Sequence, residues 1–225
     1  MKRILLSTVL FTIAAFAQRP FVRATGEGVV SFIPDLVSLT ISVQNSGATA
    51  QEAGDANARQ TTAVIAAVKQ VIGGTGEVKT IGYSITPQYR YPQNADPVLT
   101  GYRAVNSIQA KSSDLNLAGR IIDAASGAGA TTVGGLGFAL KDSNPARREA
   151  LRLATAQARL SVEAMAAGIS GKIGAVVSIE EGFAQRVVGT DGRAAGGVAA
   201  TAPTPIEAGM LEVRATVTLE AELFQ

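Results

Sequence analysis

The amino-acid sequence predicts an α+β fold in which helices pack on largely antiparallel sheets. First, residues 37–44 and 211–223 alternate between apolar and polar side chains, which is typical of strands with one buried face. Second, residues 48–72 and 144–169 instead place apolar or small residues at helical spacing. Third, 47% of the 225 residues are apolar and 17% are charged, so a chain of this length can bury a sizeable core.

The N-terminal segment, residues 1–17, has the three-part pattern of a secretory signal peptide. Two basic residues precede an apolar run at residues 4–16, and the tripeptide Ala-Phe-Ala that ends at Ala17 fits the small-x-small cleavage rule. The run has 13 residues, fewer than the about 20 that a membrane-spanning helix needs. We therefore expect cleavage between Ala17 and Gln18, no transmembrane segment afterwards, and a periplasmic or secreted protein. An uncleaved N-terminal anchor is the alternative.

Histidine and cysteine are both absent, which removes several classes of chemistry. The chain has no histidine-assisted serine nucleophile, no cysteine nucleophile, no imidazole or thiolate metal site and no disulfide. Lys2 and Arg3 are the only charged residues among residues 1–17, so cleavage reduces the 20 basic residues to 18, equal to the 18 acidic residues. A formally neutral chain is not expected to bind nucleic acid. No metal ion and no cofactor is expected either.

The first half of the mature chain is expected to form a strand, a helix and a hairpin. Gly73-Gly74 supplies a helix stop. Pro87 cannot donate a ladder hydrogen bond, so the far end of the hairpin is expected to be a sheet edge or a projecting arm. The predicted elements are extended chain broken by glycines at 21–31, a strand at 35–44, a helix at 48–72, and hairpin strands at 78–91 and 102–110.

The second half begins with a short helix that Asp114 is expected to cap, and a glycine-rich strand in which a bulge is expected. Pro145 fits the first position of a long helix. One side of this helix is expected to face the sheet, with Ala150, Ala154, Ala158, Val162, Met165 and Ala166. The predicted elements are helices at 114–127 and 144–169, strands at 131–140, 173–179 and 211–223, and a mobile loop at 183–209.

From residue 35 to residue 140 the predicted order is strand, helix, strand, strand, helix, strand. This is the split βαβ pattern of ferredoxin-like folds. The sequence therefore predicts a ferredoxin-like βαββαβ core followed by a further helix and two strands.

Local patterns that resemble catalytic motifs have simpler interpretations. The run from Gly168 to Lys172 lacks the spacing of a phosphate-binding loop and fits the end of a helix. Glu180 and Glu181 are neighbours on a strand, so their side chains point to opposite faces and do not form an acid/base couple. We therefore expect no catalytic residues and a protein that is not an enzyme.

All four tyrosines of the chain lie on or beside the predicted hairpin at 78–110. Tyrosine is enriched at protein interfaces, although ordinary cross-strand pairing explains the cluster equally well. Because a sheet edge with little charge tends to pair with another chain, we predict an oligomer interface that contains Tyr89, Tyr91 and Tyr102. The expected partner is a second copy of the chain.

Six short segments, taken in order and spacing, give the chain a family resemblance. They are ATGEGVVS at 24–31 followed by Pro34-Asp35, IGYSITPQY at 81–89, LTGYRA at 99–104, ARREAL at 146–151, VSIEE at 177–181 and PIEAG at 205–209. Together they resemble the SIMPL-domain family, the YggE-like exported bacterial proteins. The resemblance covers residues 18–225 as one domain. Ala208 replaces the proline that is usual in the family before the glycine.

The resemblance implies an exported envelope protein of the oxidative-stress-defence or periplasmic immunogenic type, without established catalytic residues. It also implies homo-oligomers for some members. The expected function is therefore that of a non-catalytic, self-associating envelope protein with an indirect link to oxidative-stress defence, because a chain without cysteine cannot scavenge oxidants through thiols. A monomeric periplasmic module that binds a ligand or partner, and a carboxylate-based hydrolase, are the alternatives.

Overall fold

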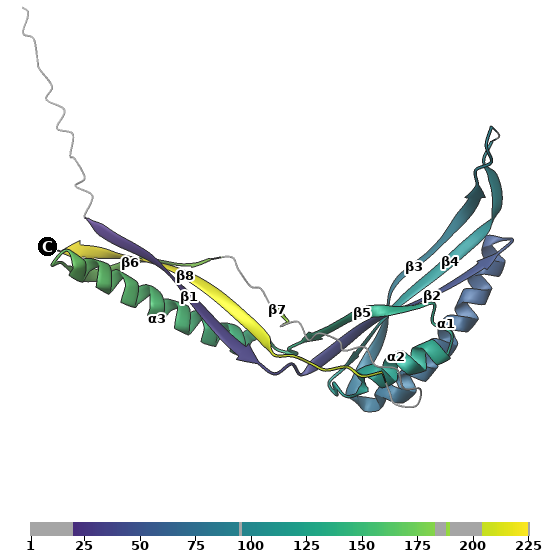
Figure 1. The fold of residues 1–225 in the computed structure, drawn as a ribbon, viewed down its shortest axis with the longest axis horizontal. Helices are drawn as coiled ribbons and strands as arrows, with labels where there is room; N and C mark the ends of the chain where they lie inside the picture. Colours follow the sequence, from purple (N-terminus) through teal and green to yellow (C-terminus); the bar gives the residue numbers. More distant parts are fainter. Residues whose placement is uncertain (1–19, 95, 183–187, 190–203, 225) are drawn as a thin grey trace, which may run out of the picture. The chain divides into compact units, whose positions relative to one another are not determined.

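The computed structural model describes residues 20–94, 96–182, 188–189 and 204–224 (Figure 1). The predicted signal peptide, its cleavage site and most of the predicted loop at 183–209 lie outside these residues. The described chain forms two compact units, each built around one antiparallel sheet. The predicted α+β class is confirmed. None of the helices among the described residues has both the length and the apolar character needed to cross a bilayer.

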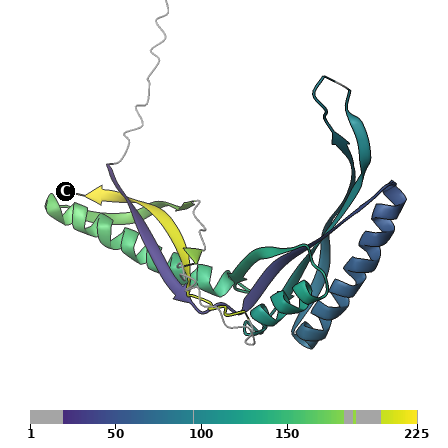
Figure 2. The same cartoon turned by 45° about the vertical axis from the view of Figure 1, so that its right-hand side comes forward.

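The βαββαβ unit is the predicted ferredoxin-like core. Its sheet has the strand order β3-β4-β2-β5, and Figures 1 and 2 show α1 and α2 on the same face of that sheet. β4 lies between β2 and β3, so one strand separates the two strands that α1 connects, as the split βαβ pattern requires. The elements are β2 (Leu36–Gly47), α1 (Ala50–Ile72), a short 3₁₀ turn (Gly73–Thr75), β3 (Gly76–Arg90), β4 (Val98–Ser112), α2 (Leu117–Gly127) and β5 (Thr132–Ala139).

The core of this unit lies between the sheet and the two helices. Its β2 residues are the four apolar members of the predicted alternation, all at most 1% exposed, and they meet the apolar stripe of α1. Burial of such side chains stabilises the fold by about 1.5–3 kcal/mol each. The buried residues include Val37, Leu39, Ile41 and Val43 of β2, Val64 and Val68 of α1, and Ile121 of α2.

Local signals fix both ends of α1. Thr49 is the N-cap: its hydroxyl accepts a hydrogen bond from the Glu52 N–H at 3.1 Å, and the Glu52 carboxylate accepts one from the Thr49 N–H at 3.3 Å. This reciprocal pair satisfies two N–H groups that the helix leaves unpaired. At the other end, Gly73 has a positive φ of 56°, which glycine adopts without strain.

The start of α2 differs from the prediction. Asp114 does not cap the helix, which begins at Leu117 after Asn116. The Asp114 carboxylate instead accepts a hydrogen bond from the Asn116 N–H at 3.0 Å, two residues along the chain. The prediction was wrong because β4 runs two residues further than predicted, to Ser112, so Asp114 falls within the turn before α2 and closes that turn.

The expected bulge in β5 is present. The register between β2 and β5 shifts between Ser38, opposite Gly137, and Thr40, opposite Gly134. Gly135 lies within the bulge with a φ of 59°. A residue with this φ is normally glycine, so the backbone path of the bulge accounts for Gly135.

The second unit contains a sheet in the order β1-β8-β6, with β7 also paired to β8. Residues 21–31 were expected to be broken by glycines but form one continuous strand, because Gly26 and Gly28 are buried within it. The elements are β1 (Phe21–Phe32), α3 (Asn144–Gly168), β6 (Lys172–Gly182), β7 (Val188–Gly189) and β8 (Leu211–Phe224).

The small residues of α3 face this sheet, as predicted. Ala150, Ala154, Ala158, Val162 and Ala166 are at most 1% exposed. Met165 was predicted to lie on the same side but is 45% exposed, because it lies one position before the stripe of residues spaced by four. The six apolar positions of β8 from Leu211 to Ala221 are buried on the same face of the sheet.

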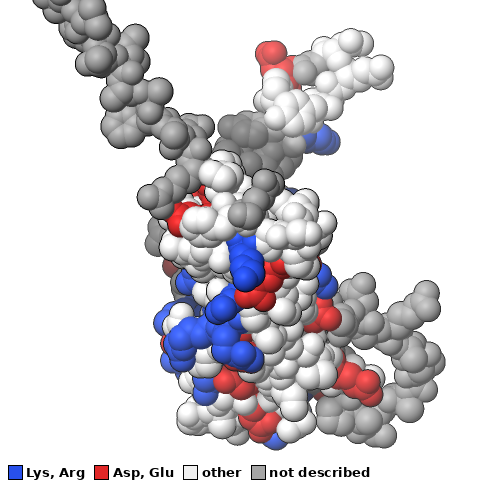
Figure 3. All heavy atoms as spheres, turned by 90° about the vertical axis from the view of Figure 1, so that its left-hand side faces the viewer, with Lys and Arg blue, Asp and Glu red and all other residues white. Residues whose placement is uncertain are grey.

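Charges of both signs lie on one face of the described residues. On the face shown in Figure 3, Lys and Arg side chains lie next to Asp and Glu side chains. Arg159 and Glu163, one helical turn apart on α3, form such a pair with 2.9 Å between Nε and Oε1. Exposed pairs of this kind contribute at most about 1 kcal/mol each.

Residues 204–206, at the end of the predicted loop, pack on the βαββαβ unit. The Thr204 hydroxyl donates to the Asp123 carboxylate of α2 at 2.8 Å, and the Thr204 N–H donates to it at 3.3 Å. Ile206 packs against the core cluster. This end of the segment is therefore held by specific contacts.

Candidate self-association surface

The far end of the β3–β4 hairpin extends beyond the rest of its sheet. β2 pairs with β4 from Ser112 down to Tyr102, so the residues of β4 before Tyr102 pair with β3 alone. We call residues 87–94 and 96–101 the arm; Figures 1 and 2 both show it projecting past β2 and α1. Pro87 lies opposite Tyr102 at its base. The far end of the hairpin was expected to be a sheet edge or a projecting arm, and it is both.

Two contacts hold the base of the arm. A Cβ on Gly101 would lie 2.7 Å from the carbonyl oxygen of Gly47, so the two backbones are in close contact. The Thr100 hydroxyl donates to the Gln88 carbonyl oxygen at 3.0 Å, next to a bulge in the β3–β4 register. The arm is therefore a defined extension of the sheet.

β3 is one edge of the sheet and carries little charge. Among the described residues no strand pairs with its outer side, along its 15 residues. Its charged residues are Glu77 and Lys79 near the start and Arg90 at the end, so residues 80–89 contain none. Edge strands are normally protected by charge, proline or a cover, and here Pro87 is the main protection.

The predicted interface tyrosines lie at two places. Tyr89 is on the arm and is 47% exposed, while Tyr91 follows β3 directly and is 75% exposed. Tyr102 lies at the base of the arm, partly buried between Pro87 and Gly47 in the neighbouring strands. The structure thus brings Tyr89 and Tyr91 together on the arm and places Tyr102 within the sheet.

Four aliphatic side chains, which the sequence analysis did not select, extend this surface. Leu99 lies directly opposite Tyr89 on the arm and is 45% exposed. The absence of charge over residues 80–89 could have indicated Ile81 and Ile85, whereas Val98 and Leu99 lie on the other strand of the hairpin. The exposed aliphatic residues of the hairpin are Ile81, Ile85, Val98 and Leu99.

The motifs examined for catalysis have structural roles. Glu180 lies opposite Thr218 and Glu181 opposite Val217, at successive positions, so the two side chains leave opposite faces of the sheet. The described residues contain no group of three or more carboxylates placed to hold a metal ion.

The segment from Gly168 to Lys172 ends α3 and begins β6. The Gly171 N–H donates to the Ala166 carbonyl oxygen at 2.8 Å, and Ser170 has a φ of 61°. This is the hydrogen-bonded turn of a helix C-terminus, as predicted, and not a phosphate-binding loop.

Comparison with known proteins gives two similar relatives. The chain is 30% identical over 182 residues to the "26 kDa periplasmic immunogenic protein" of Brucella melitensis biotype 1 and equally to that of Brucella abortus (strain S19). In both cases the match covers 76% of this chain and 73% of the relative.

A family model described as "SIMPL: Protein of unknown function (DUF541)" matches residues 22–221. The match includes α1, α2, α3, the arm and nearly all of both sheets. It agrees with the resemblance that the short segments indicated. The chain therefore belongs to the SIMPL family.

Proposed function

We propose that this protein is an exported envelope protein, periplasmic or secreted, that self-associates through the arm and the outer edge of β3 and catalyses no reaction. The observation that carries the proposal is the uncharged edge at residues 80–89, beside exposed Tyr89 and Tyr91. An edge strand of a second copy would form backbone hydrogen bonds with the unpaired edge of β3 and would cover its exposed apolar side chains.

Two further observations support export. The N-terminal pattern at residues 1–17 is that of a signal peptide. The two Brucella relatives are named as periplasmic proteins. The SIMPL resemblance also suggests a link to oxidative-stress defence; in a chain without cysteine such a link acts through binding or assembly.

The test of self-association is sedimentation velocity of the mature protein and of the double variant Tyr89→Ala, Tyr91→Ala. Loss of an interface anchor costs about 2 kcal/mol or more, and the loss repeats at every copy of the contact. We therefore expect smaller particles with an unchanged circular dichroism spectrum.

Leu160→Ala is the matched control, since Leu160 is 60% exposed on α3, outside the arm. It should leave the particle size unchanged. A wild-type protein that is monomeric at high concentration, or a double variant of unchanged size, would refute the proposal and favour the monomeric binding module.

A further inference from the structure

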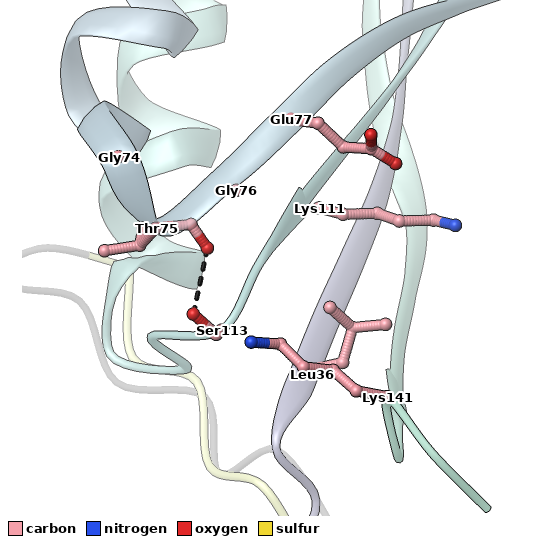
Figure 4. A pocket seen from close by; sticks show the side chains of 8 residues that line it. All are labelled: Leu36, Gly74, Thr75, Gly76, Glu77, Lys111, Ser113 and Lys141. Atoms are coloured by element: carbon pink, nitrogen blue, oxygen red, sulfur yellow. Dashed lines mark hydrogen bonds between the residues drawn. The ribbon is translucent and has the colours of Figure 1, made fainter.

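A cavity of about 450 Å³, widely open to solvent, lies at the end of the βαββαβ sheet opposite to the arm, where β2 and β3 begin and β4 and β5 end. Its volume falls within the range of about 300–1,000 Å³ that is typical of small-molecule sites. Figure 4 shows its lining, which includes Leu36, Thr75, Glu77, Lys111, Ser113 and Lys141 together with two glycines.

One wall of the cavity is held by a hydrogen-bond network. The Thr75 carbonyl oxygen accepts from both the N–H and the hydroxyl of Ser113, each at 2.9 Å. The Thr75 hydroxyl in turn donates to the Ile72 carbonyl oxygen at 2.7 Å. These bonds tie the end of α1 to the end of β4, so this wall is formed before any ligand binds.

Two lysines give the cavity its charge. Within the described part of the chain, neither Lys111 nor Lys141 forms an ion pair. The Lys141 N–H donates to the Asp35 carboxylate at 2.7 Å, which holds its backbone, while Figure 4 shows its ammonium group extended toward Ser113.

The one carboxylate in the lining, that of Glu77, already forms an ion pair. Glu77 Oε2 lies 2.9 Å from the Lys79 ammonium, which is not part of the lining. The hydrogen bond from Lys79 lowers the pKa of Glu77, with a smaller contribution from the charge of Lys111. The Glu77 charge is thus largely balanced by Lys79, and Lys111 and Lys141 leave the cavity positive.

We propose that this cavity binds a small organic anion, with its oxyanion group, a carboxylate or a phosphate, at the ammonium of Lys141 and with Lys111 as a second cation. The volume exceeds that of an inorganic ion, because a water molecule occupies only about 30 Å³. Leu36 provides a small apolar surface for the rest of the ligand. Attraction between charges therefore supplies most of the affinity, and added salt weakens it.

The experiment is isothermal titration calorimetry of the mature protein with citrate, with inorganic phosphate and with vesicles of anionic phospholipid. We expect saturable binding that Lys141→Gln weakens by at least about tenfold, the loss of one well-placed charge contact. Lys172→Gln removes the same charge at the start of β6, outside the cavity, and should change affinity less than about twofold.

Acetylation of lysines followed by mass spectrometry gives a second readout of position. The bound anion should protect Lys141 and Lys111 from the reagent and leave Lys172 unprotected. Protection by citrate or phosphate identifies a free anion as the ligand, and protection by vesicles alone identifies a lipid headgroup; both support the proposal.

Three results would overturn it: no saturable binding of any probe, wild-type affinity in Lys141→Gln, or equal weakening in the Lys141 and Lys172 variants. The double variant Tyr89→Ala, Tyr91→Ala should bind the anion normally, because the arm lies at the other end of β3. The cavity and the self-association surface can therefore fail independently.

Discussion

Gly26 of β1 lies against the backbone of Ala154 in α3. A Cβ at residue 26 would overlap the Ala154 carbonyl oxygen and the Ala158 N–H, far inside van der Waals contact. Both alanines are fully buried. β1 and α3 can therefore pack this closely because Gly26 has no side chain and the facing residues of α3 are alanines.

Gly26→Ala should destabilise the protein, because the new methyl group has only backbone atoms to displace. We expect a loss of about 1–3 kcal/mol in the free energy of unfolding, the usual cost of overpacking. Urea denaturation followed by circular dichroism measures it. Gly134→Ala, at a strand glycine with open space around its Cβ position, is the control and should cost less. Equal stability of Gly26→Ala and wild type would mean that β1 and α3 pack differently.

Asn57 is a buried polar residue of α1 whose amide joins the helix to the sheet. Its Nδ2 donates to the Val43 carbonyl oxygen at 2.8 Å and lies 3.2 Å from Asn45 Oδ1. Asn57→Ala leaves these acceptors without that donor, and we expect a loss of about 1–3 kcal/mol in urea denaturation. Thr62→Ala, on the exposed side of the same helix, should change stability by less than about 0.5 kcal/mol. Similar losses of stability in both variants would contradict the stabilising role of the Asn57 amide hydrogen bonds.

Gly119 of α2 should determine whether residues 204–206 can dock. A Cβ at residue 119 would overlap the Thr204 carbonyl oxygen, whereas a Cβ at Gly127 of the same helix would meet nothing within 4 Å. Gly119→Ala is therefore expected to speed amide hydrogen exchange at residues 204–210, while Gly127→Ala should not. Unchanged exchange in Gly119→Ala would show that the docking is weaker than the geometry indicates.

Glu77 should titrate below its ordinary pKa of 4.5, because Lys79 donates a hydrogen bond to its carboxylate. A lowered pKa in the folded state means that the carboxylate adds stability above the unfolded-state pKa and loses it as the pH falls through the folded-state pKa. Lys79→Gln should raise the pKa of Glu77 toward its ordinary value, as should high salt. An NMR titration of the side-chain carboxyl carbon measures both. No change on replacing Lys79 would contradict the assignment.

If the protein is exported with cleavage of its signal peptide, the mature chain should have one defined N-terminal residue. Intact-mass measurement on protein purified from the envelope fraction should give a chain that begins at Gln18, since the cleavage motif ends at Ala17. Ala17→Arg places a large charged residue at the cleavage site and should leave the precursor uncut. Membrane-bound wild type that retains Met1 would support the uncleaved anchor instead.

The sequence by itself determined the elements whose signals are local. The alternation over residues 37–44 predicted β2 and its buried face, and Gly73-Gly74 predicted the end of α1. The order of these elements predicted the βαββαβ topology. Hydrophobic periodicity and turn chemistry act over a few residues, so one chain segment contains the whole signal.

Contacts between distant segments were decided only by the tertiary structure. The glycine at residue 26 looked like a break in the chain, because its reason, the backbone of α3, lies more than a hundred residues away in sequence. Met165 was assigned by helical spacing and Asp114 by the capping preference of its residue type, but Met165 is exposed and Asp114 lies in the turn before α2.

The same distinction applies to the candidate sites. The tyrosines could be selected from the sequence, because they are close together in it, but Leu99 becomes part of that surface only through its register opposite Tyr89. The cavity could not be found at all from the sequence. Its two lysines lie on segments 30 residues apart, and only the arrangement of four strand ends brings Lys111 and Lys141 around one space. The sequence gives the chemistry of each side chain, whereas residues that are distant in sequence come close together only once the chain has folded.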